Sequence, residues 1–65
     1  MVRINGKDEN IAEGTGLVQY LEDAGYNRER IAVEINGDII PKKNYDETVL
    51  NDGDKIEIVS FVGGG

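Results

Sequence analysis

The sequence contains no cysteine, no histidine and no tryptophan among its 65 residues. Without cysteine the chain cannot form a disulfide. Without cysteine and histidine it also lacks the thiolate and imidazole ligands of zinc, haem and iron–sulfur sites. The same absences exclude a histidine-activated serine or cysteine nucleophile. We therefore predict no catalytic residue and no metal site within this chain.

Basic residues and long apolar runs are also scarce. Seven lysines and arginines face 13 aspartates and glutamates, so the net charge is −6. The basic residues are scattered, with Lys42-Lys43 as the only adjacent pair, whereas the phosphate backbone of nucleic acid favours clustered cations. No apolar run approaches the roughly 20 residues of a membrane span or forms a secretory signal. We predict one small cytoplasmic domain that binds neither nucleic acid nor membrane.

Two Asn-Gly pairs each predict a tight β-hairpin turn. This dipeptide favours the type I′ turn, because both central residues of that turn need a positive φ. Asn5-Gly6 follows a short apolar strand at 2–4 and precedes a weakly apolar return strand at about 7–12. The charged side chains of that return strand are typical of a sheet edge.

The second pair, Asn36-Gly37, follows a strand in which Ile31, Val33 and Ile35 alternate with more polar residues. Ile39-Ile40 forms the return strand. It ends at Pro41, because proline has no N–H to donate to a strand ladder.

Between the two hairpins, apolar residues recur at helical spacing. They are Leu17, Val18, Tyr20, Leu21 and Ala24. Thr15 is the predicted N-cap, and Gly25 is the predicted C-terminal glycine in the left-handed conformation. A helix of about nine residues is unstable alone in water, so we expect it to dock on a sheet.

The segment 42–50 shows no clear period and is interpreted as a loop with room for one helical turn. Its expected anchors are Tyr45, Val49 and Leu50. A turn at 51–54 then leads into a last strand, in which Ile56, Ile58 and Ser60 give the alternation.

This order of elements favours an α+β fold with two layers. One helix can cover only one face of a small sheet. The ferredoxin-like fold needs two helices, and the five-stranded oligonucleotide-binding barrel needs no helix after its first hairpin. The β-grasp, or ubiquitin-like, arrangement fits best. It has a mixed four- to five-stranded sheet packed on one main helix, and its last strand lies beside the first. We divide the chain into a domain at 1–62 and a flexible C-terminal tail at 63–65.

The tail, Gly63-Gly64-Gly65, is the most informative feature for function. Average glycine usage is about 7%, so three consecutive glycines are uncommon by chance. Glycine supplies no packing and costs conformational order, so a folded domain has little use for it here. A tail without Cβ atoms can, however, enter a narrow channel and present its carboxylate to an enzyme. The alternative interpretation is a terminal linker without function.

Several segments of the chain resemble the ThiS family of thiamine-biosynthesis sulfur carriers. They are the opening Val-Arg-Ile-Asn-Gly hairpin, the stretch Ala32–Pro41, the stretch Thr48–Val59 and the end Phe61–Gly65. The resemblance covers the whole chain without an insertion. The Asn-Gly-x-Ile-x-Pro hairpin and the Asp-Gly-Asp turn are markers of the fold, whereas only the diglycine end is functional.

The resemblance implies a carrier protein rather than an enzyme. In this family an E1-like adenylating enzyme of the ThiF type uses ATP and magnesium to activate the terminal carboxylate, here that of Gly65. Sulfur derived from cysteine then converts it to a thiocarboxylate. The tail delivers this sulfur to thiazole synthase, the ThiG-type partner. Gly64 matches the other diglycine position, and Gly63 is treated as part of the tail that enters the partner. A monomer is expected, because the carrier must dock with successive enzymes.

Phe61 and Val62 are the candidate partner interface, because an exposed apolar pair beside the tail could anchor docking. The opposing interpretation is that Phe61 packs under the end of the last strand. Tyr20 and Tyr26 are assigned to the core or its rim.

The paired carboxylates, such as Glu22-Asp23 and the two aspartates of Asp52-Gly53-Asp54, are interpreted as solvated surface. Neighbouring helical side chains diverge by about 100°, so Glu22 and Asp23 do not converge on a substrate. The Asp-Gly-Asp turn is much shorter than a calcium-binding EF-hand loop.

Other functions stay open at this point. The chain could instead carry sulfur to molybdopterin or to a tRNA base. It could be a ubiquitin-like modifier whose Gly65 forms isopeptide bonds with lysines. It could also be a β-grasp binding module in which the glycines have no role.

Overall fold

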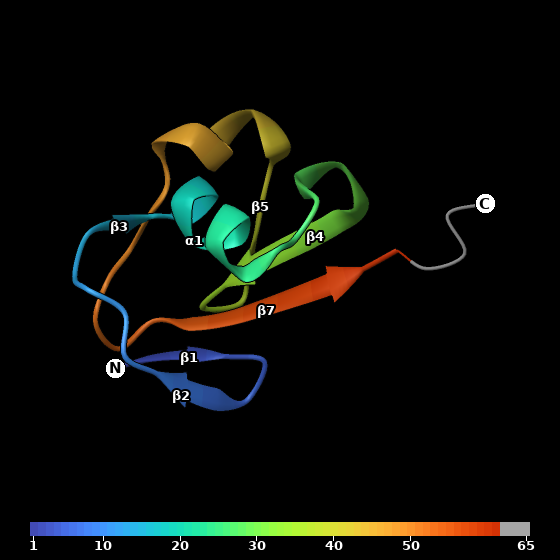
Figure 1. Cartoon of the computed structure of the whole chain (residues 1–65). Helices are drawn as coiled ribbons and strands as arrows, with labels where there is room; N and C mark the ends of the chain where they lie inside the picture. Colours follow the sequence, from blue (N-terminus) through green and yellow to red (C-terminus); the bar gives the residue numbers. More distant parts are fainter. Residues whose placement is uncertain (62–65) are drawn as a thin grey trace.

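The structure, a computed structural model, describes residues 1–61 and contains a five-stranded sheet with one main helix on one side (Figure 1). The strands lie in the order β2-β1-β7-β4-β5. Their bounds are β1 Val2–Ile4, β2 Lys7–Glu9, β4 Ile31–Ile35, β5 Asp38–Ile40 and β7 Lys55–Ser60. Because β7 is parallel to β1 and antiparallel to β4, the sheet is mixed. The predicted α+β architecture, with the last strand beside the first, is confirmed.

Both Asn-Gly turns form as predicted. The φ angles are 50° at Asn5 and 83° at Gly6, and 53° at Asn36 and 89° at Gly37. The return strand after the first turn is shorter than expected, because β2 ends at Glu9. The chain then leaves the sheet edge, and Ile11 packs against the core instead of extending the hairpin.

The helix α1 spans Leu17–Ala24 and buries Leu17 and Leu21. Gly25 ends it in the left-handed conformation, as predicted, with φ 84°. The prediction of Thr15 as N-cap was wrong: Gly16 holds that position and no side chain caps the helix. The carbonyl of Thr48 satisfies the first helical N–H, that of Leu17, at 2.8 Å. A tertiary contact therefore replaces the side-chain cap.

Thr15 belongs instead to a second, two-stranded sheet. Its strands are β3, Thr15–Gly16, and β6, Val49–Leu50, which pair antiparallel. The hydroxyl of Thr15 donates to the carbonyl of Ala12 at 2.7 Å. This small sheet joins the start of α1 to the segment before β7.

The segment 42–50 is more regular than predicted. It begins with a six-residue 3-10 helix, η2, at Lys42–Glu47. Tyr45 and Leu50 are buried, at 1% and 0% exposure, so two of the three predicted anchors are confirmed. The third was wrong, because Val49 is 46% exposed. Neighbouring residues of a strand point to opposite faces, and Leu50 takes the inward face of β6.

The hydrophobic core lies between the sheet, α1 and η2. Alternate residues of β1, β4 and β7 point toward the helix, as their period of two predicts. The buried apolar residues are Val2, Ile4, Leu17, Leu21, Ile31, Val33, Tyr45, Leu50, Ile56 and Ile58. Tyr20 and Tyr26 are partly buried against this cluster, in agreement with their predicted place at the core or its rim. Among residues 1–61, no helix is long and apolar enough to cross a membrane.

Candidate functional site

The chain reaches its C-terminal segment through β7, which lies in the middle of the large sheet. On one side β7 pairs with β1, where Arg3 lies opposite Lys55 and Ile4 opposite Ile56. On the other side it pairs with β4 along its whole length from Ile56 to Ser60. The inward side chains of Ile56 and Ile58 are buried, whereas Ser60, the third residue of the predicted alternation, is exposed. The segment that follows therefore starts from a strand held on both edges and by the core.

Phe61 carries the last hydrogen bond of the described chain. Its main-chain N–H donates to the carbonyl of Arg30 at 2.7 Å. Arg30 ends a short 3-10 helix, η1 (Arg28–Arg30), which the side chain of Asn27 caps. The guanidinium of Arg28 lies 5.5 Å from the centre of the Tyr45 ring, a cation–π distance that connects η1 to η2. These contacts hold η1, and with it the Arg30 carbonyl that accepts from the Phe61 N–H, against the rest of the domain.

Two asparagine side chains hold β7 from its two sides. The carboxamide of Asn5 accepts from the N–H of Ile58 at 2.7 Å and donates to the carbonyl of the same residue at 3.2 Å. The carboxamide of Asn36 accepts from the N–H of Lys55 at 2.9 Å and donates to the Asp54 carboxylate at 3.0 Å. Sequence analysis identified both asparagines only as turn residues. The strand order is needed to see that both turns lie beside β7.

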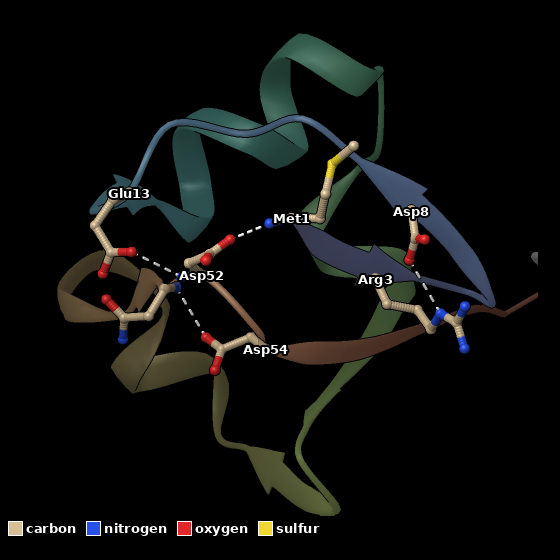
Figure 2. Close-up of polar contacts among 7 residues, drawn as sticks. Met1, Arg3, Asp8, Glu13, Asp52 and Asp54 are labelled. Carbon is tan, nitrogen blue, oxygen red and sulfur yellow. Dashed lines mark hydrogen bonds and ion pairs between the residues drawn. The ribbon is translucent and has the colours of Figure 1, made fainter.

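The turn at 51–54 holds the beginning of β7 and the start of the chain (Figure 2). The amino group of Met1 pairs with the Asp52 carboxylate, and the Met1 carbonyl accepts from the N–H of Gly53 at 2.8 Å. The Glu13 carboxylate accepts from the N–H of Asp52 at 2.9 Å. The Asp54 carboxylate accepts from a main-chain N–H of the turn at 2.9 Å. The two aspartates thus stabilise the turn. Asp52 is exposed, as predicted, whereas Asp54 is half-buried.

The predicted interface residue Phe61 is exposed. It is 55% accessible, so the interpretation that it packs under the end of β7 was wrong. Two further apolar residues that sequence analysis did not select are also exposed, Ile39 at 74% and Val59 at 59%. Because successive side chains of a strand point to opposite faces, Ile39 and Val59 fall on the face of the sheet opposite the core. Whether a partner contacts Phe61 stays a prediction. Val62, Gly63, Gly64 and Gly65 lie outside the described residues.

The described residues form a scaffold and show no arrangement of a catalytic centre. Within residues 1–61, no group of three acidic side chains is placed to hold a metal ion. Glu22 and Asp23 are exposed on α1, as predicted. Glu34 and Glu57 lie opposite each other on β4 and β7, where a pair of like charges opposes pairing rather than supporting it.

Comparison with known proteins identifies the family. The model of the ThiS family matches residues 2–65. The chain belongs to the ThiS family. The sulfur carrier protein ThiS of Bacillus subtilis is 48% identical over 67 aligned positions, which cover all of both chains. The alignment therefore spans both the β-grasp scaffold and the glycine end.

Solved ThiS structures have the same fold. The crystal structure of the thiamine biosynthesis protein ThiS from Geobacter metallireducens superposes with a TM-score of 0.82 at 31% sequence identity. The match covers 98% of this chain and 97% of the other. The β-grasp prediction is confirmed.

A larger relative contains a segment similar to this ThiS-family chain. The thiazole synthase of Paramagnetospirillum magneticum is 42% identical over 62 residues. These residues are 95% of this chain but only 19% of that protein. The chain thus spans about a fifth of the thiazole synthase that it matches.

Proposed function

We propose that this chain carries sulfur as a thiocarboxylate at Gly65 and delivers it for thiazole formation in thiamine biosynthesis. The chain is a sulfur carrier of the ThiS family and is not itself an enzyme. The observation that carries the proposal is the full-length similarity to the sulfur carrier protein ThiS of Bacillus subtilis, which includes the glycine end. The firm attachment of β7 up to Phe61 supports the division into a scaffold at 1–62 and a presented tail at 63–65.

The carboxylate of Gly65 is a poor electrophile, so the first step must activate it. One of its oxygens attacks the α-phosphorus of ATP on an E1-like adenylating enzyme. Pyrophosphate leaves and an acyl-adenylate forms. Magnesium on that enzyme offsets the phosphate charge. Bisulfide released from a cysteine-derived source then attacks the acyl carbon, AMP leaves, a proton is lost, and a thiocarboxylate remains on the carrier. Because ATP is consumed, we expect the cycle to take place in the cytoplasm.

Thiazole synthase is the proposed acceptor of the sulfur. A segment similar to this chain occurs within a protein named thiazole synthase, which supports a working relationship between the two activities. Carriers for molybdopterin or for a tRNA base share the same tail chemistry, and the acceptor assay below separates them. Gly63 and Gly64 have no side chains and so can pass through a narrow channel to the acceptor site.

The test is the intact mass of the chain after incubation with the adenylating enzyme of its host, ATP, magnesium and a cysteine-derived sulfur source. We expect a mass gain equal to sulfur replacing oxygen. Deletion of Gly65 should abolish the gain and leave the melting temperature unchanged, because the ten core residues found among residues 1–61 lie between Val2 and Ile58. The thiocarboxylated chain should then support thiazole formation by thiazole synthase.

Three results would contradict the proposal. One is the absence of a mass gain when the enzyme preparation is active on another carrier. The second is a gain that persists without Gly65. The third is a thiocarboxylate that molybdopterin or tRNA enzymes accept and thiazole synthase does not. Lysine conjugates that survive reductant and denaturant would identify a protein modifier instead.

A further inference from the structure

We propose that Asn5 is a positioning residue for sulfur loading. Its carboxamide replaces a missing strand residue beside Ile58 and fixes the point from which the C-terminal segment leaves the sheet. This inference rests on the proposed function, because it concerns how the Gly65 carboxylate reaches the adenylating enzyme. Asn5 lies near the beginning of the chain and the Gly65 carboxylate at its end. The sequence alone therefore does not indicate that the two are related.

The strand β1, which pairs with β7 on the side of Asn5, is too short to pair with all of β7. β1 has three residues and β7 has six. The main-chain ladder between them ends where the N–H of Asn5 donates to the carbonyl of Ile56 at 2.9 Å. Figure 1 shows β7 running on past the β1–β2 hairpin toward the C-terminus. From Ile58 onward, β1 therefore offers no further strand residue to this edge of β7.

The Asn5 side chain supplies the next rung of the ladder. In a parallel ladder two residues of the neighbouring strand would share these bonds, one accepting from the N–H of Ile58 and the next but one donating to its carbonyl. The single carboxamide of Asn5 makes both bonds, at 2.7 and 3.2 Å. An amide side chain is suited to this role because it carries a donor and an acceptor, as a peptide unit does. On the opposite edge, Phe61 is bonded to the carbonyl of Arg30. The end of β7 is thus held on one edge by Asn5 and on the other by η1.

This anchoring matters for chemistry because a short tail transmits any movement of its origin to its end. Four residues separate Phe61 from the terminal carboxylate. The acyl transfer needs this carboxylate aligned with the α-phosphorus of ATP, and small misplacements of a reacting group lower the rate strongly. If the Ile58 edge is released, the docked tail has more freedom. The fraction of complexes in a reactive geometry then decreases while docking itself is preserved.

The chain offers a matched control in Asn36. Both asparagines have a φ near +50° and precede glycine in a tight turn, and both hold β7 through the side chain. Asn36 acts at Lys55, the end of β7 remote from the tail, whereas Asn5 acts at Ile58. Glycine accepts a positive φ without strain, so Asn5→Gly and Asn36→Gly each preserve the turn and remove the carboxamide.

The experiment compares the two variants with the wild-type chain by amide hydrogen exchange and by loading kinetics. Exchange should become at least about tenfold faster at the Ile58 N–H in Asn5→Gly, and at the Lys55 N–H in Asn36→Gly. The rate of thiocarboxylate formation is then measured against carrier concentration at a temperature at which all chains are folded. We expect kcat to fall about tenfold in Asn5→Gly with KM within about twofold, and both constants to stay near wild type in Asn36→Gly.

Asn5→Asp gives an independent check if Asn5→Gly does not fold. It keeps an oxygen that can accept from the Ile58 N–H and loses the donor to the Ile58 carbonyl, so its kcat should lie between those of wild type and Asn5→Gly. Equal kcat values for the Asn5 and Asn36 variants would overturn the positioning role and leave the carrier function intact. A wild-type chain that accepts no sulfur would instead overturn the proposed function, and the positioning role with it.

Discussion

The main-chain N–H of Phe61 donates to the carbonyl of Arg30 over 2.7 Å, while Phe61 itself is 55% exposed. The backbone at the end of the scaffold is therefore held in place, and an aromatic ring is left in solvent beside it. Exposure of a large apolar side chain has no stabilising role in the free protein. We predict that a partner covers the ring as the tail enters.

Phe61→Ala should weaken loading without destabilising the fold. Because the ring is exposed, we expect the free energy of unfolding to change by about 0.5 kcal/mol or less. The KM for loading should rise severalfold if the ring docks on the adenylating enzyme. Val49→Ala is the matched control, since Val49 is also exposed, at 46%, but lies in the small sheet. Unchanged KM in Phe61→Ala would remove Phe61 from the interface.

Ile56→Ala should destabilise the domain by about 2–5 kcal/mol, because it leaves a cavity at a fully buried position of β7. Urea denaturation measures this change as a lower midpoint at constant slope. Val59→Ala, on the exposed side of the same strand, should change the free energy of unfolding by about 0.5 kcal/mol or less. Similar losses in the two variants would contradict the assigned core face.

Gly25→Ala should cost about 1–2 kcal/mol through backbone strain alone. Gly25 ends α1 with φ 84°, and a Cβ placed there would meet no atom within 4 Å. Steric clash therefore does not contribute. Gly25→Asn should cost less, since asparagine tolerates the left-handed region better. Thermal and urea unfolding of both variants would measure the difference, and an equal or greater loss in Gly25→Asn would argue against a conformational cause.

Tyr20 should make stability fall at high pH. Burial raises the pKa of the Tyr20 phenol above its ordinary value, and the nearby negative charge of Glu9 raises it further. The unfolded chain loses this proton near pH 10 while the folded chain retains it. The stability that the protonated Tyr20 phenol contributes is thus fully present below about pH 10. It is lost as the pH rises toward the pKa of Tyr20 in the folded chain.

The measurement is the difference in free energy of unfolding between wild type and Tyr20→Phe, followed from pH 8 to pH 11. We expect this difference in free energy of unfolding to be constant up to about pH 10. Above that pH the wild type should lose stability relative to Tyr20→Phe. Glu9→Gln removes one of the two main causes, so it should reduce that loss. A difference that does not change with pH would contradict the raised pKa.

Much of the local structure could be predicted from sequence, because short-range conformational preferences determine it. Asn5-Gly6 and Asn36-Gly37 form the turns that a positive φ requires, and Gly25 ends the helix. The alternation of Ile31, Val33 and Ile35, and of Ile56 and Ile58, correctly indicated strands with one inward face. The Asn-Gly-x-Ile-x-Pro hairpin, the Asp-Gly-Asp turn and the glycine end together carried the resemblance to the family. These signals depend on a residue and its near neighbours.

The relationships between distant segments were decided only by the tertiary structure. The first N–H of α1 bonds to the Thr48 carbonyl, so Thr15 was not needed as a cap. Phe61 lies outside the core cluster and is 55% exposed, although its main chain is bonded to Arg30. Asn5 reaches Ile58, 53 positions away, only because β7 inserts beside β1. The chain composition determined that this protein cannot catalyse through histidine, cysteine or a metal held by them. The packing of β7 between β1 and β4 determined where its C-terminal segment starts, because a strand's position depends on partners that no local pattern encodes.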